Sequence, residues 1–400
     1  MERVLPEQVG LSGEGLDAVD AAVQAKIDAG IVVGAVTLTL RHGRIARVRT
    51  LGLDDIETAK PLAEDTIFRI FSMTKPITGT AMMILHDAGL WRPEDPIARH
   101  LPELANLMVL DGEGRVSADH QPTMTELMTH RAGFGYGLTL GEPKDRIEAL
   151  YREACVLQAA DLDEMIARLA TLPLAHQPGT LWRYSLSMDV QGAIIERLSG
   201  QRLADFLRTR IFEPLGMRDT GFFVPPEKRD RLASLYFKPL DGPLEKWAVN
   251  PMRPDPESEP AFAMGGAGLY STALDYARYA QLLLGGGTFE GRRIVSAEGV
   301  RAQMTNRLPD ALLETRFVAG HQKFRPGFGY GYNGVVVTDP ELAGLPVGRG
   351  SYHWDGAAGT WFWVDPENNL AFVGMIQLLS YAAPPLQEIT QALMAGAIAG

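Results

Sequence analysis

The sequence contains one cysteine, Cys155, among its 400 residues. A single thiol excludes an internal disulfide framework and a zinc site built from several thiolates. No uninterrupted apolar stretch reaches the roughly 18 residues that a membrane-spanning helix needs. The first residues, 1–7, do not combine a basic start with an apolar stretch, so they predict no export signal. These absences together predict a cytoplasmic protein that has no membrane partner.

Positive charge is scarce as well. The formal net charge is −11, from 38 Lys and Arg against 49 Asp and Glu, and no run of basic residues interrupts this balance. Binding to a phosphate backbone requires a concentrated positive field, so we expect no nucleic-acid partner. Hydrophobic residues make up 46% of the chain, which is enough for a large core and is compatible with most classes of enzyme.

Three familiar enzyme signatures are missing. No serine has glycine two positions before and after it, which excludes the nucleophile elbow of α/β-hydrolases. The eight histidines include no H-E-x-x-H pattern or other close ligand pair, so we expect no metal site. Residues 329–334 match G-x-G-x-x-G in form, but the valines after them predict a strand rather than the helix that a dinucleotide site needs.

Hydrophobic periodicity predicts strands at both ends of the chain and helices in its middle. The expected strands are residues 32–40, 45–53, 330–337, 359–364 and 370–378, with terminal helices at 11–29 and 385–399. The turn-forming pair His42-Gly43 predicts that the first two strands form a hairpin. The expected middle helices are 73–89, 161–172, 188–200, 203–212 and 272–284. The simplest arrangement is an α+β fold, in which both chain ends build one antiparallel sheet flanked by helices, with an inserted, mostly helical region. We expect residues 1–72 and 325–400 to form the sheet domain and residues 73–324 to form the helical domain.

The strongest local signal is the segment Ser72-Met73-Thr74-Lys75, where a β-like stretch ends and a helical pattern begins. At a helix start a serine hydroxyl is exposed, and backbone N–H groups point toward developing negative charge. Lys75 lies three residues later on the same helical face, and it can accept the serine proton if burial lowers its pKa. The same pattern also fits a serine N-cap followed by an unrelated surface lysine, so it needs support from other segments.

Two further segments supply that support. Tyr184 precedes the helix expected at 188–200, on a loop where a phenol can relay a proton, although a packed aromatic side chain is the commoner role. Residues 353–361 are rich in glycine and alanine and open a strand. Small residues let the backbone approach a substrate, and one N–H in this stretch can complete an oxyanion hole with that of Ser72. A glycine-rich strand start without such a role is the alternative.

The order of three motifs, Ser72 to Lys75, Tyr184 to Leu186 and Trp354 to Gly356, resembles that of the serine β-lactamase and penicillin-recognising enzyme superfamily. Within the superfamily the chain is most similar to the class C-like family VIII carboxylesterases. Other segments that look like this superfamily are residues 127–134, 177–179, 212–217 and 265–269. The match therefore runs over nearly the whole chain.

The resemblance implies a role for each matching residue. Ser72 would be the acylated nucleophile, and Lys75 and Tyr184 would share the work of general base and acid. The backbone N–H groups of Ser72 and Ala357 would form the oxyanion hole. The resemblance also implies that no metal or organic cofactor is needed, and that the active site lies in the cleft between the two expected domains.

The chain departs from class C β-lactamases in two motifs. Their Tyr-x-Asn is replaced by a motif that ends in Leu186, and their Lys-Thr-Gly is replaced by Trp354-Asp355-Gly356. A cation exchanged for an indole and an acid removes the attraction for an anionic substrate. Family VIII esterases commonly carry Trp at the first of these positions, whereas Asp355 is less usual there. His353 beside them is interpreted as structural rather than as a proton partner.

These departures favour a serine carboxylesterase that acts on small, largely uncharged esters. A β-lactamase, a D-amino-acid peptidase or amidase, and an acyltransferase that uses the same acyl-enzyme are alternatives, and a non-catalytic binding relative is an alternative of a different class. The only partner expected is a small-molecule ester. The residues expected to contact it are Trp354, Asp355, Gly356, Leu186, Phe134 and Tyr136.

Overall fold

A computed structural model of the chain describes residues 1–137, 142–250, 254–313, 317–319, 322–324, 326–380 and 382–398. Its main feature is an eight-stranded antiparallel sheet with the order β14-β15-β16-β17-β18-β1-β2-β3. The strands are β1 (Gly34–Arg41), β2 (Arg44–Asp55), β3 (Lys60–Pro61), β14 (Phe328–Tyr330), β15 (Val335–Val337), β16 (Tyr352–Asp355), β17 (Trp361–Asp365) and β18 (Leu370–Met375). The α+β class and the sheet built from both chain ends are thus confirmed. The expected boundary at residue 325 lies outside the described residues, and the division into two domains stays a prediction.

The centre of the sheet joins the two ends of the chain. β1 and β2 form the expected hairpin, and the turn between them places His42 at φ 52° and Gly43 at φ 75°. On its other side β1 pairs with β18, in a register that runs from Val36 opposite Met375 to Arg41 opposite Leu370. Because these partners lie more than 300 residues apart, this pairing fixes the distance between the N-terminal and C-terminal halves of the site.

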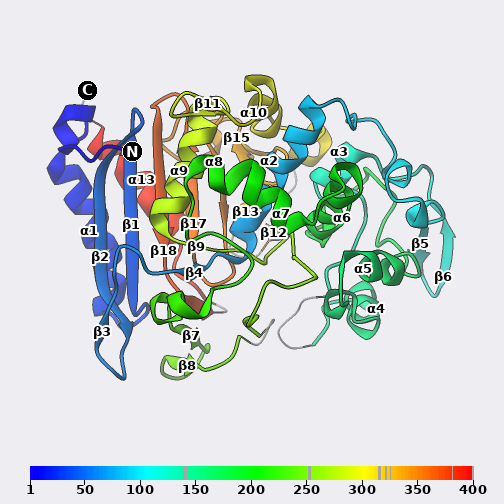
Figure 1. Ribbon diagram of the computed structural model, residues 1–400, viewed down its shortest axis with the longest axis horizontal. Helices are drawn as coiled ribbons and strands as arrows, with labels where there is room; N and C mark the ends of the chain where they lie inside the picture. The colour runs from blue at the N-terminus through cyan, green and yellow to red at the C-terminus, as the bar shows by residue number, and fades with distance from the viewer. Residues whose placement is uncertain are drawn as a thin grey trace.

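Helices cover both faces of the sheet, which is why β1, β17 and β18 are buried along almost their whole length (Figure 1). Helices α1 (Gly13–Asp28) and α13 (Leu386–Ala397) pack together on one face. They approach so closely that a Cβ on Gly15 would lie 2.4 Å from the Ala397 Cα. Helix α9 (Ala273–Leu284) covers the opposite face, and the Thr272 side chain caps its first turn.

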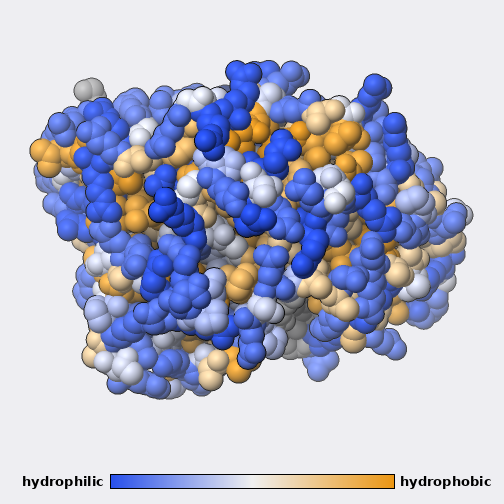
Figure 2. Space-filling model, viewed as in Figure 1, coloured by the Kyte–Doolittle hydropathy of each residue, from blue (hydrophilic) through white to orange (hydrophobic). Residues whose placement is uncertain are grey.

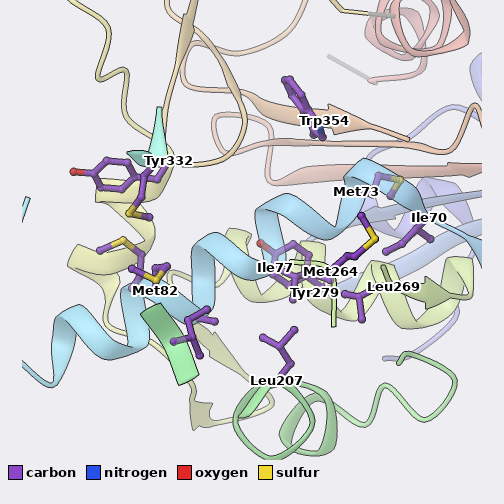
Figure 3. Packing of buried hydrophobic residues seen from close by; sticks show 14 of the residues in the cluster. Ile70, Met73, Ile77, Met82, Leu207, Met264, Leu269, Tyr279, Tyr332 and Trp354 are labelled. Atoms are coloured by element: carbon purple, nitrogen blue, oxygen red, sulfur yellow. The ribbon is translucent and has the colours of Figure 1, made fainter. Parts of the chain in front are cut away.

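Helix α2 (Thr74–Asp87) runs through the main core, beside the sheet and among the helices of the middle region. Figure 3 shows apolar side chains around it that come from elements far apart in the sequence, among them Trp354 above the helix and Leu207 below it. Twelve of its residues, from Thr74 to Leu85, are buried. A helix buried on all sides holds its first turn rigidly, and that turn carries the Ser-x-x-Lys motif.

The remaining elements are short. The helices are α3 (Met124–Met128), α4 (Arg146–Glu153), α5 (Leu162–Leu169), α6 (Ser187–Ser199), α7 (Leu203–Leu207), α8 (Glu213–Leu215), α10 (Ala297–Gln303), α11 (Asp310–Leu313) and α12 (Pro340–Ala343). The small sheets are β4 (Phe68–Arg69) with β9 (Tyr270–Ser271), β5 (Met108–Asp111) with β6 (Gly114–Ser117), β7 (Leu235–Lys238) with β8 (Glu245–Trp247) and β19 (Leu378–Ser380), β10 (Thr288–Phe289) with β11 (Arg292–Arg293), and β12 (Phe317–Ala319) with β13 (Gln322–Phe324).

Three expected elements differ from the structure. The strand expected at 330–337 is a hairpin of β14 and β15, because Asn333 turns the chain with φ 63°. The strand expected at 370–378 is two strands, of which β19 leaves the main sheet and pairs with β7. The helix expected at 203–212 is α7 followed by one π-helical turn, Arg208–Phe212. The other expected helices are present with shifted ends.

The visible surface is dominated by polar side chains, with apolar side chains in interrupted patches (Figure 2). Among the described residues, no helix has both the length and the apolar character needed to cross a membrane. In the same part of the chain, no group of three or more His, Cys, Asp or Glu side chains is arranged to hold a metal ion.

Candidate active site

Ser72 lies in the turn between β4 and α2, within the 3-10 segment Phe71–Met73. The residue before it, Phe71, has φ 43°, which is the left-handed region that non-glycine residues rarely adopt. Such a conformation costs about 1–2 kcal/mol and persists only where the surroundings enforce it. Here the Ile70 N–H donates to the Leu269 carbonyl (3.1 Å), and Gln377 bonds both the N–H and the C=O of Arg69. Strain next to the half-buried Ser72 hydroxyl marks this turn as a candidate functional site.

Lys75 lies one helical turn after Ser72 and is completely buried. Its Nζ is 3.1 Å from the Ser72 Oγ, 2.8 Å from the Gly266 carbonyl oxygen and 3.3 Å from the Tyr136 hydroxyl. It also lies 4.6 Å from the centre of the Tyr184 ring. These contacts hold the amine against the serine hydroxyl.

Burial lowers the pKa of Lys75 to about 7, because an ammonium ion without water is unfavourable. The negative charges of Asp189 and Asp355 act in the opposite direction and favour the ammonium form. Near neutral pH a large fraction of Lys75 is therefore the free amine, whose lone pair can accept a proton.

Tyr184 also contacts Ser72, and its hydroxyl donates to the Ser72 Oγ at 2.7 Å. Burial raises the pKa of this phenol well above its usual value, and the hydrogen bond to Ser72 only partly offsets the increase. The ring stacks on Tyr136, with centroids 5.4 Å apart, and on Trp182 at 6.2 Å. Tyr184 is therefore a protonated hydroxyl held in one orientation by aromatic neighbours.

The His130 ring packs against that of Tyr184, although His130 was not predicted as a site residue. Its Nδ1 accepts the Ser185 N–H at 3.2 Å, its carbonyl oxygen accepts the Arg183 N–H at 2.9 Å, and its ring centre lies 4.8 Å from that of Tyr184. Burial lowers the pKa of His130 well below its usual value, and the nearby Lys75 charge adds to this effect. The imidazole is thus a neutral brace for the tyrosine loop.

The third motif ends β16 beside this group. Trp354 is buried, and its ring lies 5.8 Å from that of Tyr184 and 5.6 Å from that of Tyr330. Position 356 requires glycine, because a Cβ there would lie 2.4 Å from the Ile70 carbonyl oxygen. Ala357 follows and packs in a small apolar cluster with Phe71. The turn after β16 is thereby held against the turn that carries Ser72.

The structure separates the other predicted contacts into two groups. Tyr136 lies in the site, where its hydroxyl meets Lys75, and Asp355 is 9% exposed at the end of β16. Phe134 and Leu186 have no exposed surface and belong to the main core, so the geometry gives no support to substrate contact by either. His353 is also buried, next to Trp354 on the strand, and its ring lies edge-on to Phe328 at 5.9 Å.

Three residues near Lys75 were not identified from the sequence. The Gly266 carbonyl contacts the Lys75 amine, and the Asp189 Oδ1 accepts the Gly266 N–H at 3.1 Å. The Asn333 side chain donates to the Lys75 carbonyl at 3.0 Å and to the Gln191 Oε1 at 2.7 Å. The G-x-G-x-x-G pattern thus forms a turn that braces α2. Gly266 lies in the segment 265–269 that resembles the superfamily, and Asn333 lies in the G-x-G-x-x-G pattern, whereas no motif pointed to Asp189.

Comparison with known proteins gives a consistent result. The family model for beta-lactamase matches residues 19–395. Protein Rv1367c of Mycobacterium tuberculosis is 38% identical over 371 residues, covering 90% of each chain, and esterase EstB of Burkholderia gladioli is 34% identical over 346 residues, covering 83% of this chain and 82% of EstB.

Two solved structures are similar over nearly the whole chain. EstCE1, described as a hydrolase with promiscuous acyltransferase activity, has a TM-score of 0.78 at 25% identity and covers 96% of this chain and 98% of its own. Unliganded simvastatin synthase LovD of Aspergillus terreus has a TM-score of 0.81 at 22% identity, with coverage of 96% and 99%. The second likeness bears on the fold alone.

Proposed function

The chain belongs to the beta-lactamase family, as a serine hydrolase, and from this premise we propose that it is a carboxylesterase. In this proposal it hydrolyses small, largely uncharged esters through an acyl-enzyme on Ser72. The observation that carries the proposal is the position of the Ser72 Oγ, 3.1 Å from the Lys75 amine and 2.7 Å from the Tyr184 hydroxyl. The esterase relative EstB and the hydrolase EstCE1 support the same chemistry.

Acylation begins with the free amine of Lys75. As the Ser72 Oγ forms a bond to the ester carbonyl carbon, its proton passes to the Lys75 Nζ, which becomes an ammonium ion. The carbonyl oxygen becomes an oxyanion, and the N–H groups of Ser72 and Ala357 donate to it. When the tetrahedral intermediate collapses, the bond from carbon to the alkoxy oxygen breaks. The leaving oxygen takes the Tyr184 proton, and Lys75 returns a proton to the phenolate.

Deacylation repeats these steps with water in place of the alcohol. Water gives a proton to the Tyr184 and Lys75 pair as its oxygen attacks the acyl carbon, and the Ser72 oxygen leaves with a proton from the same pair. Tyr184 acts as donor and relay rather than as the first base, because its raised pKa keeps it protonated at neutral pH. Lys75, with a pKa of about 7, is the group that can begin the cycle.

The charge around the site supports a neutral substrate. Asp355 stands where class C β-lactamases have a residue that receives a carboxylate, and it is close enough to Lys75 and Tyr184 to affect both pKa values. An anionic substrate group placed there meets a like charge in a poorly hydrated site, which is unfavourable. A neutral ester meets no such repulsion.

A panel of substrates tests the proposed function. We expect the wild-type protein to hydrolyse p-nitrophenyl butyrate with a kcat/KM at least about 100-fold above that for nitrocefin and for D-alanyl-D-alanine peptides with a free carboxylate, because a like-charge contact costs about 3 kcal/mol in such a site. Release of p-nitrophenol and the absorbance change of nitrocefin are the measurements. Comparable efficiencies for nitrocefin and the ester would instead establish a β-lactamase.

Acyl transfer is the second candidate, and the aromatic walls of the site favour it. The Tyr184 ring beside the serine packs against the rings of Tyr136, Trp182 and Trp354. Apolar walls bind an alcohol better than they bind water. In the same assays with added 1-butanol, butyl butyrate among the products reports transfer, and butyrate alone reports hydrolysis.

The pH dependence of kcat/KM follows from the state of Lys75. The base must be uncharged, so we expect activity to be full above pH 7 and to fall about tenfold for each pH unit below it. Initial rates with p-nitrophenyl butyrate between pH 5 and pH 9 give this profile, with a stable fold confirmed at each pH. A fall in kcat/KM that is centred near pH 4 instead would point to a carboxylate base and would contradict this role for Lys75.

A further inference from the structure

A buried carboxylate is linked to Lys75 through one residue, Gly266, by the N–H of one peptide group and the C=O of the next. Asp189 is the third residue of α6 and has no exposed surface. Its Oδ1 accepts the Gly266 N–H at 3.1 Å, and the Gly266 carbonyl oxygen accepts a hydrogen bond from the Lys75 Nζ at 2.8 Å. The chain of contacts therefore runs from Asp189 through Gly266 to Lys75, and from there to Ser72.

The two glycines of this segment make the arrangement possible. A Cβ on Gly266 would lie 2.8 Å from the Asp189 Oδ2, and a Cβ on Gly265 would lie 2.4 Å from the Met188 carbonyl oxygen. The segment can therefore lie directly on the first turn of α6 only without side chains at these positions. The Thr78 hydroxyl, which donates to the Gly265 carbonyl at 2.7 Å, holds the segment to α2 from the other side.

We propose that Asp189 is a positioning residue for the reaction, which fixes the Gly266 carbonyl on Lys75 and supplies the negative charge that stabilises the ammonium ion formed when Ser72 loses its proton. This inference rests on the proposed function, because it concerns the proton that acylation transfers. It adds to that function a residue outside the three motifs that carried it.

Two carboxylates supply the negative charge that stabilises the ammonium form of Lys75. Tyr136 and Tyr184 face the amine as uncharged phenols, and His130 is a neutral imidazole. The negative charges that act on Lys75 are Asp189 from α6 and Asp355 from β16. Asp189 has the larger influence of the two, and it is fully buried whereas Asp355 is 9% exposed, so its field is screened less.

The variant Asp189→Asn tests this role, because the amide oxygen can still accept the Gly266 N–H while the charge is removed. We expect kcat on the high-pH plateau to fall about 10- to 100-fold with KM changed less than about twofold, since the new ammonium ion loses a counter-charge. We also expect the acidic limb of the pH profile to move down by about one pH unit, because the ammonium form is destabilised in the free enzyme as well. Steady-state kinetics from pH 5 to pH 9 measure both effects.

Asp365→Asn is the matched control. This carboxylate is also buried, at 1% exposure, and accepts the Gly348 N–H at 2.8 Å, but it is not one of the charges that act on Lys75. We expect its acidic limb to stay where the wild-type limb lies. A lower plateau in Asp189→Asn with an unmoved limb would show a purely structural role and would overturn the inference.

A second variant covers the case in which Asp189→Asn does not fold. Gly266→Ala keeps every charge but forces the Asp189 carboxylate aside, so the same two effects are expected in a weaker form. A lower kcat at high pH in Gly266→Ala, with the acidic limb of its pH profile at the wild-type pH, would also overturn the inference. Ester hydrolysis by the wild-type protein tests the proposed function separately. An inactive wild type would contradict that function, whereas a variant with an unshifted pH profile would contradict only the role of Asp189.

Discussion

The variant Ser72→Ala is expected to lower kcat/KM for p-nitrophenyl butyrate by about 10⁴-fold or more. The hydroxyl is the atom that forms the acyl bond, and neither Lys75 nor Tyr184 can replace it as a nucleophile in the same position. Oxyanion-hole donors and substrate binding remain in the variant, so a small rate above the uncatalysed reaction is expected to persist. Initial rates at saturating and at limiting substrate measure the loss.

Mass spectrometry of the intact protein provides the second readout for this serine. After treatment with a fluorophosphonate, we expect one adduct on the wild-type protein and none on Ser72→Ala. Ser117→Ala, which removes an exposed hydroxyl on β6, is the matched control and should keep both the activity and the adduct. Undiminished ester hydrolysis by Ser72→Ala would contradict the proposed function. Fluorophosphonate labelling at another serine would then identify the true nucleophile.

The sequence was sufficient for the parts of the fold that depend on local pattern. The hairpin 32–53 was predicted because β-like residues flank the turn-forming pair His42-Gly43, and the structure pairs these strands with one register shift between Thr39 and Leu40. The prediction failed at residues 330–337, where apolar and aromatic residues outweighed the Asn333-Gly334 pair. That pair is a strong turn signal, and Asn333 adopts the positive φ that such turns require.

The catalytic candidates Ser72, Lys75 and Tyr184 were predicted from two separate motifs, and the structure places both Lys75 and Tyr184 within hydrogen-bonding distance of Ser72. Their neighbours could not be predicted in the same way. Asp189 and Gly266 are 77 residues apart in the chain, and nothing local indicates that one peptide N–H meets one carboxylate. Phe134 and Leu186 were predicted to contact the substrate but are fully buried. An apolar residue beside a motif has the same sequence pattern whether it lines a pocket or fills the core.

The strain at Phe71 links the fold to the chemistry. A left-handed residue before the nucleophile is maintained by the hydrogen bonds of Arg69 and Ile70 and by the apolar cluster of Phe71, Leu235, Ala358 and Leu379. The same cluster packs against Ala357, so the two proposed oxyanion donors are positioned by one group of side chains. If these N–H groups are the oxyanion donors that we propose, the reaction needs little rearrangement when negative charge develops on the substrate oxygen.

The variant Lys75→Met is expected to lower kcat by about 10³-fold while leaving the serine in place. Methionine approximates the length of the lysine stem, but it cannot accept the Ser72 proton, so acylation must proceed without a general base. The acidic limb near pH 7 should disappear from the residual activity, because the group that titrates there has been removed. Kinetics between pH 5 and pH 9 with p-nitrophenyl butyrate measure both changes.

Lys26→Met serves as the control for this substitution, because Lys26 lies in the last turn of α1, in a helix that packs against the sheet with α13. Lys26→Met should keep the wild-type kcat and the wild-type acidic limb near pH 7 in its pH profile. Fluorophosphonate should still label Lys75→Met at Ser72, about 10³-fold more slowly than the wild type, since only the activating group is missing. A residual limb that stays at pH 7 in Lys75→Met would assign that titration to another group and remove Lys75 from the role of base. We therefore expect Lys75→Met to react slowly at an intact Ser72, at a rate that does not depend on pH. This follows because the buried amine of Lys75 is the group that accepts the Ser72 proton in the proposed reaction.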